Sequence, residues 1–186
     1  MKKTLFLLFL VTTFCISNIS AQKSVPKNYQ QKYTSSCLEQ WTKGQYIDKE
    51  QIKNIDWLEY LYWLKKVFGE ESPEYKTAVP NKKVLYQQLP ETMAKNYAES
   101  PAYRQQPVLG VSTEQALAYC RWRTDRVAEQ MLVKMKFIKY NPNQTKNDYF
   151  TLDKYQAPEG MRFLRFSLPT RISETRFGFR CAAAWK

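Results

Sequence analysis

The stretch STEQALAYCRWRTDRVAEQM, residues 112–131, decides the expected architecture of the chain. Ser112 followed by Gln115 is the pattern of a capping box, in which two side chains satisfy backbone N–H groups at the start of a helix. Apolar positions then recur on one helical face, at Ala116, Tyr119, Cys120, Val127 and Met131, while Arg121, Asp125 and Glu129 fall on the other. The pattern predicts a helix that begins at Ser112 and buries one face.

A second helix is expected from Asn54, whose side chain can cap it, to the residues before Gly69. Its apolar residues recur at helical spacing: Trp57, Leu58, Leu61, Trp63, Leu64, Val67 and Phe68. An aromatic stripe of this kind suits either a ligand platform or a buried face, and the spacing favours the buried face.

Five prolines within residues 70–107 exclude long regular elements there. A short strand is expected over Val84–Gln88 and a short helix over Glu91–Glu99. The partial alternation of residues 131–140 allows either a continuing helix or a strand, and the sequence leaves both open.

Two elements are expected after the turn at Pro158-Glu159-Gly160. The alternating apolar residues of Met161–Leu168 predict a strand. The apolar closing segment Phe177–Trp185 is expected to pack back on the core. We therefore expect the chain, apart from its N-terminal segment, to fold as one domain with a core of ordinary size.

The N-terminus has the three parts of a secretory signal: Lys2 and Lys3, an apolar run from Leu5, and a small-residue site that ends at Ala21. An uncleaved anchor is disfavoured because polar residues interrupt the run. Phe14 precedes Cys15, where a lipoprotein signal requires a small residue. We therefore expect export and cleavage after Ala21, an exposed lead-in over residues 22–46, and a single domain over residues 47–186.

Loss of Lys2 and Lys3 leaves 27 basic and 17 acidic residues, a net charge of +10. Such an excess suits nucleic acid, an anionic envelope surface or an acidic partner protein. The basic residues are scattered and form no nucleic-acid-binding module, so an acidic partner or a membrane surface is favoured. The chain contains no His. This excludes catalytic triads that use His, His general bases and His-ligated metal sites.

Three blocks of the chain resemble the formylglycine-generating enzyme family, also called the sulfatase-modifying factor domain. They are the segment Asp48–Leu61, the segment Pro107–Arg123 with its A-Y-C-x-W core, and the pair Leu168-Pro169-Thr170 with Gly178-Phe179-Arg180-Cys181-Ala182. The likeness is greatest to the family's versions in envelope proteins of gliding motility and type IX secretion. It implies an irregular α+β domain of C-type-lectin-like type, here trimmed, with two main helices.

The same resemblance implies that catalysis is lost. In the family, a long central region follows L-P-T, whereas here Gly178 comes only eight residues after Thr170. The family's oxidase binds copper(I) through two closely spaced cysteines, a soft-ligand arrangement. Cys37, Cys120 and Cys181 include no such pair. We therefore expect no enzyme activity, catalytic residue, cofactor or metal.

Cys120 and Cys181 match the family positions that form a structural disulfide, so the resemblance implies a bridge between them. Two buried free thiols remain the alternative. Such a bond persists outside the cytoplasm, and closing its 61-residue span would stabilise the fold by about 4 kcal/mol. Cys37 is left over, as a free thiol or a link to another chain.

The leading functional hypothesis is a non-catalytic interaction or scaffold component of a bacterial envelope assembly, linked to gliding or type IX secretion. A sugar- or peptide-binding lectin-like module is the alternative, and a deep aromatic-lined pocket would favour it. A degenerate oxidase that uses Cys37 ranks third. Acidic residues that could form a carboxylate pair or calcium site show no distinctive spacing and are interpreted as surface: Asp56, Glu59, Glu91, Glu114 and Asp125.

Overall fold

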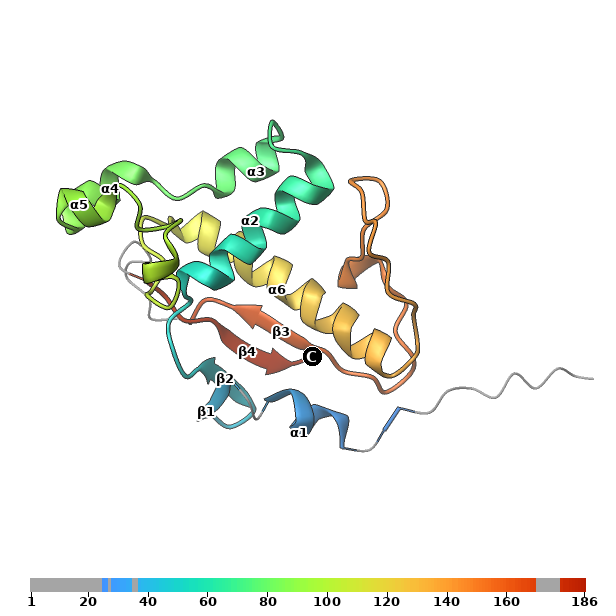
Figure 1. Ribbon diagram of the computed structural model, residues 1–186. Coiled ribbons are helices and arrows are strands. Elements are labelled where there is room, and N and C mark those ends of the chain that lie inside the picture. The colour runs from blue at the N-terminus through green and yellow to red at the C-terminus, as the bar shows by residue number, and fades with distance from the viewer. Residues whose placement is uncertain (1–24, 27, 35–36, 170–177) are drawn as a thin grey trace, which may run out of the picture.

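A four-stranded antiparallel sheet forms one side of the protein, and helices cover one of its faces (Figure 1). The structure is a computed structural model that describes residues 25–26, 28–34, 37–169 and 178–186. Within this part of the chain the protein is a mixed α+β fold, so the expected α+β class is confirmed. The expected signal peptide, residues 1–21, lies outside the described residues.

The sheet joins segments from both ends of the chain. Its order is β1 (Leu38–Thr42), β2 (Gln45–Asp48), β4 (Ala182–Trp185) and β3 (Leu164–Ser167), and every neighbouring pair is antiparallel. The C-terminal strand β4 therefore lies between a strand from the N-terminal half and β3. Cys181, just before β4, accepts a hydrogen bond at its carbonyl oxygen from the Asp48 N–H group, 2.9 Å away.

The expected exposed lead-in over residues 22–46 is wrong for much of its length. β1 and the first residues of β2 belong to the sheet, and Leu38 is buried in the core. Helix α1 (Tyr29–Thr34) docks on the fold through Tyr29, whose hydroxyl donates to Arg162 O at 3.0 Å and accepts from Arg162 N–H at 2.8 Å. Both the pairing of β2 with β4 and the Tyr29 hydrogen bonds join residues that are far apart in the sequence. The polar local sequence therefore does not indicate them.

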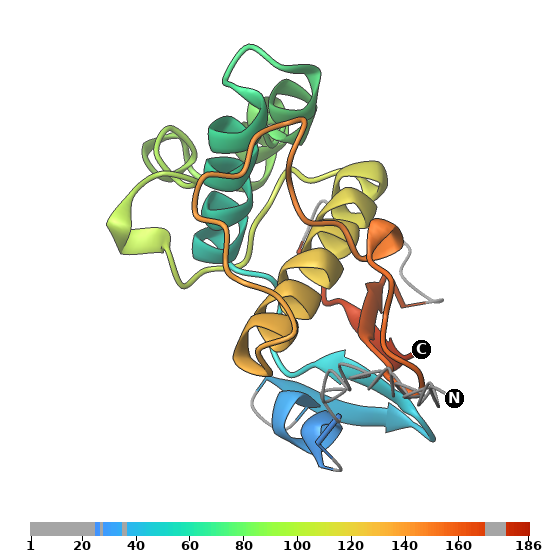
Figure 2. The ribbon, with the colours of Figure 1, turned by 90° about the vertical axis from the view of Figure 1, so that its right-hand side faces the viewer.

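Helix α6 (Thr113–Lys134) packs against the sheet (Figure 2). The expected capping box is confirmed: Ser112 Oγ accepts from Gln115 N–H at 3.2 Å, and Gln115 Oε1 accepts from Ser112 N–H at 2.7 Å. Thr124 Oγ1 accepts from the backbone N–H of Phe166 in β3 at 2.9 Å. This buried contact fixes the helix on the sheet.

Helix α2 (Asn54–Phe68) lies against α6 on the side away from β3 and β4 (Figure 1). Trp57 stacks on Tyr119 of α6, with ring centroids 5.3 Å apart, and is 2% exposed. The expected role of Asn54 as the cap is wrong, because Asn54 is the first helical residue. The Asp56 carboxylate accepts from the Lys53 N–H at 2.9 Å instead. Gly69 ends the helix, as expected.

The proline-rich region forms short helices: α3 (Pro73–Ala78), α4 (Lys82–Gln88), α5 (Glu91–Ala94) and the 3-10 turn η1 (Pro101–Tyr103). The expected strand over Val84–Gln88 is wrong, since these residues belong to α4. Asn81 starts that helix by accepting a hydrogen bond from Lys83 N–H at 3.0 Å. The helix expected over Glu91–Glu99 is confirmed only as far as Ala94.

The remaining expectations hold in shortened form. α6 ends at Lys134, and Lys136 has a φ of 62°, so residues 131–140 continue the helix briefly and form no strand. A 3-10 turn, η2 (Leu152–Lys154), follows. The strand expected over Met161–Leu168 is confirmed at β3, and the closing segment packs on the core through Phe179 and β4, although Phe177 lies outside the described residues.

Three hydrophobic clusters lie within the described residues. The largest lies between α2, α6 and the sheet and includes Trp57, Tyr119, Cys120 and Phe179; a second lies under the C-terminal half of α6 around Met131. The third and smallest joins α4, α5 and the turn after α5. Among the described helices, none combines the length and the apolar composition that crossing a membrane requires.

Candidate functional site

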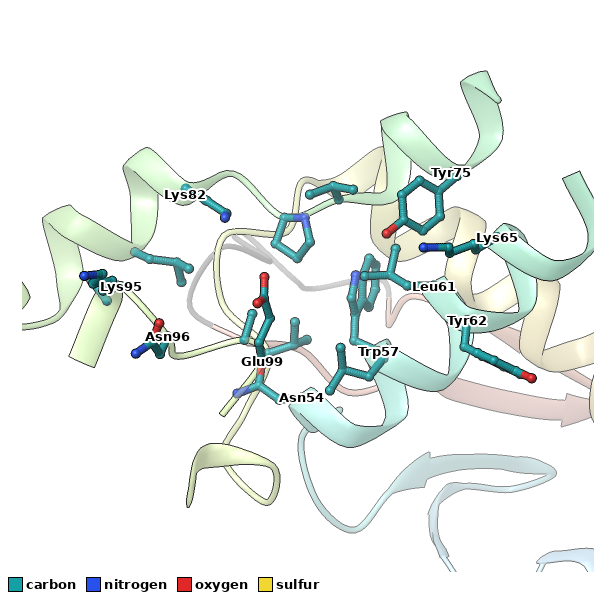
Figure 3. Close-up of a pocket in the computed structure, with 17 residues that line it drawn as sticks. Asn54, Trp57, Leu61, Tyr62, Lys65, Tyr75, Lys82, Lys95, Asn96 and Glu99 are labelled. Carbon is teal, nitrogen blue, oxygen red and sulfur yellow. The ribbon is translucent and has the colours of Figure 1, made fainter. Parts of the chain in front are cut away.

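A pocket of about 300 Å³ opens between α2 and the segment that runs from α3 to the turn before η1 (Figure 3). This volume is at the lower end of the range of small-ligand pockets. Trp57 and Val108, which line the pocket, also belong to the main hydrophobic core, so the pocket is built directly on the core.

The floor of the pocket is apolar. Trp57, Leu85 and Val108 line it and are almost fully buried, while Leu58 and Leu61 of α2 form a half-buried wall. Removal of such half-exposed leucine side chains from water is worth about 1 kcal/mol or more each. The pocket therefore suits an apolar group that reaches in from solvent.

The rim of the pocket is basic. Figure 3 shows Lys65 and Lys82 on opposite sides of the pocket, with the carboxylate of Glu99 between them. Lys65 pairs with Glu70 at 2.6 Å, and both side chains are about half exposed, so this pair is weak. Lys82 forms no ion pair with any residue that the structure describes. With Lys95 at the outer edge, three lysines and one glutamate line the pocket, and one of the lysines, Lys65, also pairs with Glu70 outside it.

Hydrogen bonds hold the pocket walls in place. Asn54 Nδ2 donates to Tyr97 O at 3.2 Å and to Tyr103 O at 3.0 Å, which ties the wall beyond α5 to the start of α2. Trp57 Nε1 donates to Ala78 O at 3.1 Å. Gln115 Nε2 bridges the carbonyl oxygens of Thr77 and Val79, at 2.8 and 2.9 Å. The pocket is thus formed before any ligand arrives.

Gly110 allows the close approach that shapes the far wall. Its φ is +74°, and a Cβ atom there would lie 2.8 Å from Asn81 O. The Asn81 N–H group donates to Gly110 O at 2.8 Å. Any side chain at position 110 would push away the turn that carries Lys82.

The polar side chains that line the pocket are lysines, tyrosines, asparagines and one glutamate. None of the described residues that line it is Ser, Thr, Cys or Asp, and Glu99 is the one carboxylic acid among them. An apolar floor with ammonium groups at its rim is suited to recognition.

Cys120 and Cys181 form the second feature of interest. The structure brings their sulfur atoms to 3.1 Å in a fully buried position between α6 and β4, as free thiols. Burial, followed by the hydrogen bond with Cys120, raises the pKa of the Cys181 thiol well above its usual range. A small shift of the side chains would allow the S–S bond that the resemblance implies.

A buried ion pair lies beside these thiols. Arg123 of α6 donates to Asp48 Oδ2 at 2.7 Å and to Asp48 Oδ1 at 2.8 Å, and Asp48 Oδ2 also accepts from Cys181 N–H at 2.9 Å. Burial opposes the charge of Arg123, but the hydrogen bonds and charge of Asp48 outweigh it and raise the pKa of the guanidinium. Helix α6, β2 and the start of β4 are joined at this point.

Cys37 is exposed and stands apart from the buried pair as a thiol open to solvent. Its sulfur lies 3.9 Å from Arg123 Nη2, so it borders the buried ion pair. Across the described residues, no group of three or more Cys, Asp or Glu side chains is placed to hold a metal ion.

The acidic candidates have separate roles. Asp56 and Glu114 act at helix starts, where they accept hydrogen bonds from Lys53 N–H and from the Ser112 hydroxyl. Asp125 is half-buried and accepts from Leu152 N–H at 2.8 Å, and burial raises its pKa. Glu59 and Glu91 are exposed on α2 and α5. The structure places these five residues in different environments.

No signal in the sequence directly indicates the pocket. Beside Asn54 and Trp57, its α2 side includes Leu58, Leu61, Tyr62 and Lys65, a second helical stripe next to the buried one. The helical spacing of this second stripe is visible in the sequence. The interpretation of α2 as a helix with one buried face, however, places the apolar residues of both stripes on that face. The opposite wall depends on tertiary contacts of the proline-rich segment, for which the sequence offers no periodic signal.

Comparisons of this chain with protein-family models, with curated proteins and with solved structures found no match.

Proposed function

We propose that the protein is a non-catalytic, exported component of a bacterial envelope assembly, and that its pocket docks an acidic, apolar segment of a partner protein. The observation that carries the proposal is the combination in one preformed pocket of an apolar floor around Trp57 with a rim of three lysines and one glutamate. The resemblance to envelope proteins of gliding motility and type IX secretion supports the setting, and it also supports a trimmed C-type-lectin-like fold.

The chemistry of the pocket defines the partner segment. An apolar side chain would fill the space between Leu61 and Val108, where burial of a leucine-sized group contributes about 2 kcal/mol. Acidic residues on either side would face Lys65 and Lys82. Such charges mainly accelerate association and select the partner. Binding to an anionic membrane surface is a less specific alternative in which the same lysines would take part.

The non-catalytic assignment rests on the thiols. The two buried cysteines support a structural role because they face each other between α6 and β4, away from solvent. In an oxidising compartment they would form the bridge that the resemblance implies. Cys37 is then the single accessible thiol among the described residues, whereas the family's copper chemistry uses two.

Site-specific photocrosslinking in the native organism tests the docking proposal. A photoreactive phenylalanine derivative would replace Val79, which lines the pocket and is 38% exposed, and in a control it would replace Trp41, which lies in β1 and is 41% exposed. The proposal predicts a discrete crosslinked protein from position 79 alone. Its sequence would contain an acidic segment with an apolar residue at the crosslink. Equal labelling from both positions would contradict the proposal.

A further inference from the structure

A second hollow lies between α2 and α6, next to the segment that joins β2 to α2. It consists of two cavities of about 570 and about 500 Å³. Both are lined by Glu59, Trp122, Arg126 and Gln130, so they adjoin along this wall. We call the two cavities together the α2–α6 groove.

Aromatic rings line the α2–α6 groove. Trp63 and Trp122 lie with ring centroids 6.4 Å apart, and Arg126 stacks over Trp63, 4.7 Å from its centroid. Trp63 is also held edge-on against Phe68. Tyr140, which is 64% exposed, stands at the outer end. The rings of Trp63 and Trp122 are held by these contacts, and rigid aromatic surfaces lose little conformational entropy when a ligand packs on them.

The charges of the groove nearly cancel. Five acidic and six basic side chains line it, whereas the whole chain carries a net charge of +12. Several are paired at short distances: Arg123 with Asp48 at 2.7 Å, and Arg126 with Glu129 at 2.8 Å. Lys66 donates to Pro142 O at 2.8 Å and so joins α2 to the loop that closes the outer end. A groove of this kind does not favour a polyanion.

Neutral hydrogen-bonding groups line the groove. Gln51, Gln105 and Gln130 are exposed, whereas Gln144 is buried and its amide already pairs with Arg126 and Glu129 at 3.0 and 2.7 Å. The ring N–H of Trp122 and the Nε–H of Arg126 are enclosed at the shared wall, and neither has an acceptor among the described residues. Buried donors of this sort are usually satisfied by a protein group or by water.

We infer that the α2–α6 groove binds a neutral oligosaccharide. Sugar rings present an apolar face that packs on aromatic rings and hydroxyl groups that pair with amides and paired charges, and the groove offers both. A nucleic acid or a sulfated glycan requires uncompensated positive charge, and a lipid requires an apolar lining. The inference goes beyond the proposed function, because the groove is a second site with a different class of ligand.

Isothermal titration calorimetry of the mature protein with chitotriose, cellotriose and maltotriose tests this inference, with a chondroitin sulfate tetrasaccharide as the anionic probe. Two variants remove groove contacts: Tyr140→Ala and Gln130→Ala. A matched control, Tyr86→Ala, removes a 49% exposed tyrosine of α4 outside the groove. A second control, Lys65→Glu with Lys82→Glu, alters only the pocket.

We expect at least one neutral trisaccharide to bind, with an affinity that changes less than about twofold between about 50 and about 500 mM NaCl. Tyr140→Ala and Gln130→Ala should each weaken binding about fivefold or more, because each removes a direct contact. The two controls should bind normally. Three results would overturn the inference: no heat with any of the three neutral sugars, equal binding by the groove variants, or binding of the anionic probe alone that disappears in salt.

Discussion

Arg123 and Asp48 face each other with two parallel hydrogen bonds of 2.7 and 2.8 Å, and both side chains are largely buried. The pair joins the middle of α6 to the end of β2, and Asp48 also holds the backbone of Cys181. Three distant parts of the sequence therefore meet at one carboxylate. A bidentate pair of this kind fixes geometry as well as charge.

Asp48→Asn should destabilise the protein by about 3 kcal/mol or more, because it leaves the Arg123 guanidinium buried without its counter-charge. Urea unfolding followed by circular dichroism measures the effect. Asp153→Asn is the matched control, since it breaks the exposed pair with Arg165 and should cost less than about 1 kcal/mol. Equal effects of the two substitutions would show that the Asp48 pair adds no special stability.

If the protein is exported, as proposed, its form purified without reductant should contain a bond between Cys120 and Cys181 and a free Cys37. Reduction should lower the free energy of unfolding by about 2–4 kcal/mol, since the bond restricts the unfolded chain. Peptide mapping under non-reducing conditions measures the first point and urea unfolding the second. Cys37→Ser should leave both unchanged. Alkylation of all three thiols in unreduced, denatured protein would rule out the bridge.

Gly110→Ala should destabilise the fold by about 2 kcal/mol, because the new Cβ would lie 2.8 Å from Asn81 O in a backbone conformation with φ of +74°. Gly44→Ala is the control. Gly44 has nearly the same φ, +78°, but no atom within 4 Å of the added Cβ, so its cost should stay near 1 kcal/mol. Thermal unfolding of the two variants separates the steric effect from the conformational one.

Burial raises the pKa of Tyr60 to about 12. The unfolded chain, with a tyrosine pKa near 10, loses this proton first. The neutral Tyr60 therefore contributes its full stability below about pH 10, and this contribution falls as the pH rises from about 10 toward 12. Tyr60→Phe should lose less stability than the wild type between about pH 10 and pH 12. Urea unfolding at each pH measures the free energy of unfolding of the two proteins. A parallel fall of the two free energies with rising pH would contradict the assignment to Tyr60.

Local signals predicted the parts of the fold that depend on local interactions. The capping box at Ser112 and the helix stop at Gly69 lie where the sequence placed them, because a few neighbouring residues decide them. A strand is expected over Val84–Gln88, yet these residues belong to a helix that Asn81 caps. β1 pairs with β2, its neighbour in the sequence. The other partner of β2 is β4, which lies more than a hundred residues away, and no short pattern encodes that pairing.

The candidate site was less predictable than the fold. Leu58 and Leu61 were correctly placed on a helix, but whether a half-buried leucine faces a core or a pocket depends on the opposite wall. That wall is held by Asn54, which contacts carbonyl groups more than 40 residues away. The sequence identified Cys120 and Cys181 only through a family resemblance.

The central claim is that the lysine-rimmed pocket docks an acidic, apolar segment, and charge reversal at its rim tests that claim most directly. Lys65→Glu with Lys82→Glu should abolish the crosslink from position 79, while Lys43→Glu with Lys146→Glu, an equal change of charge at exposed sites outside the pocket, should leave it intact. Loss of the crosslink in the rim variant alone supports the account. An undiminished crosslink in that variant, with both proteins folded, would contradict it.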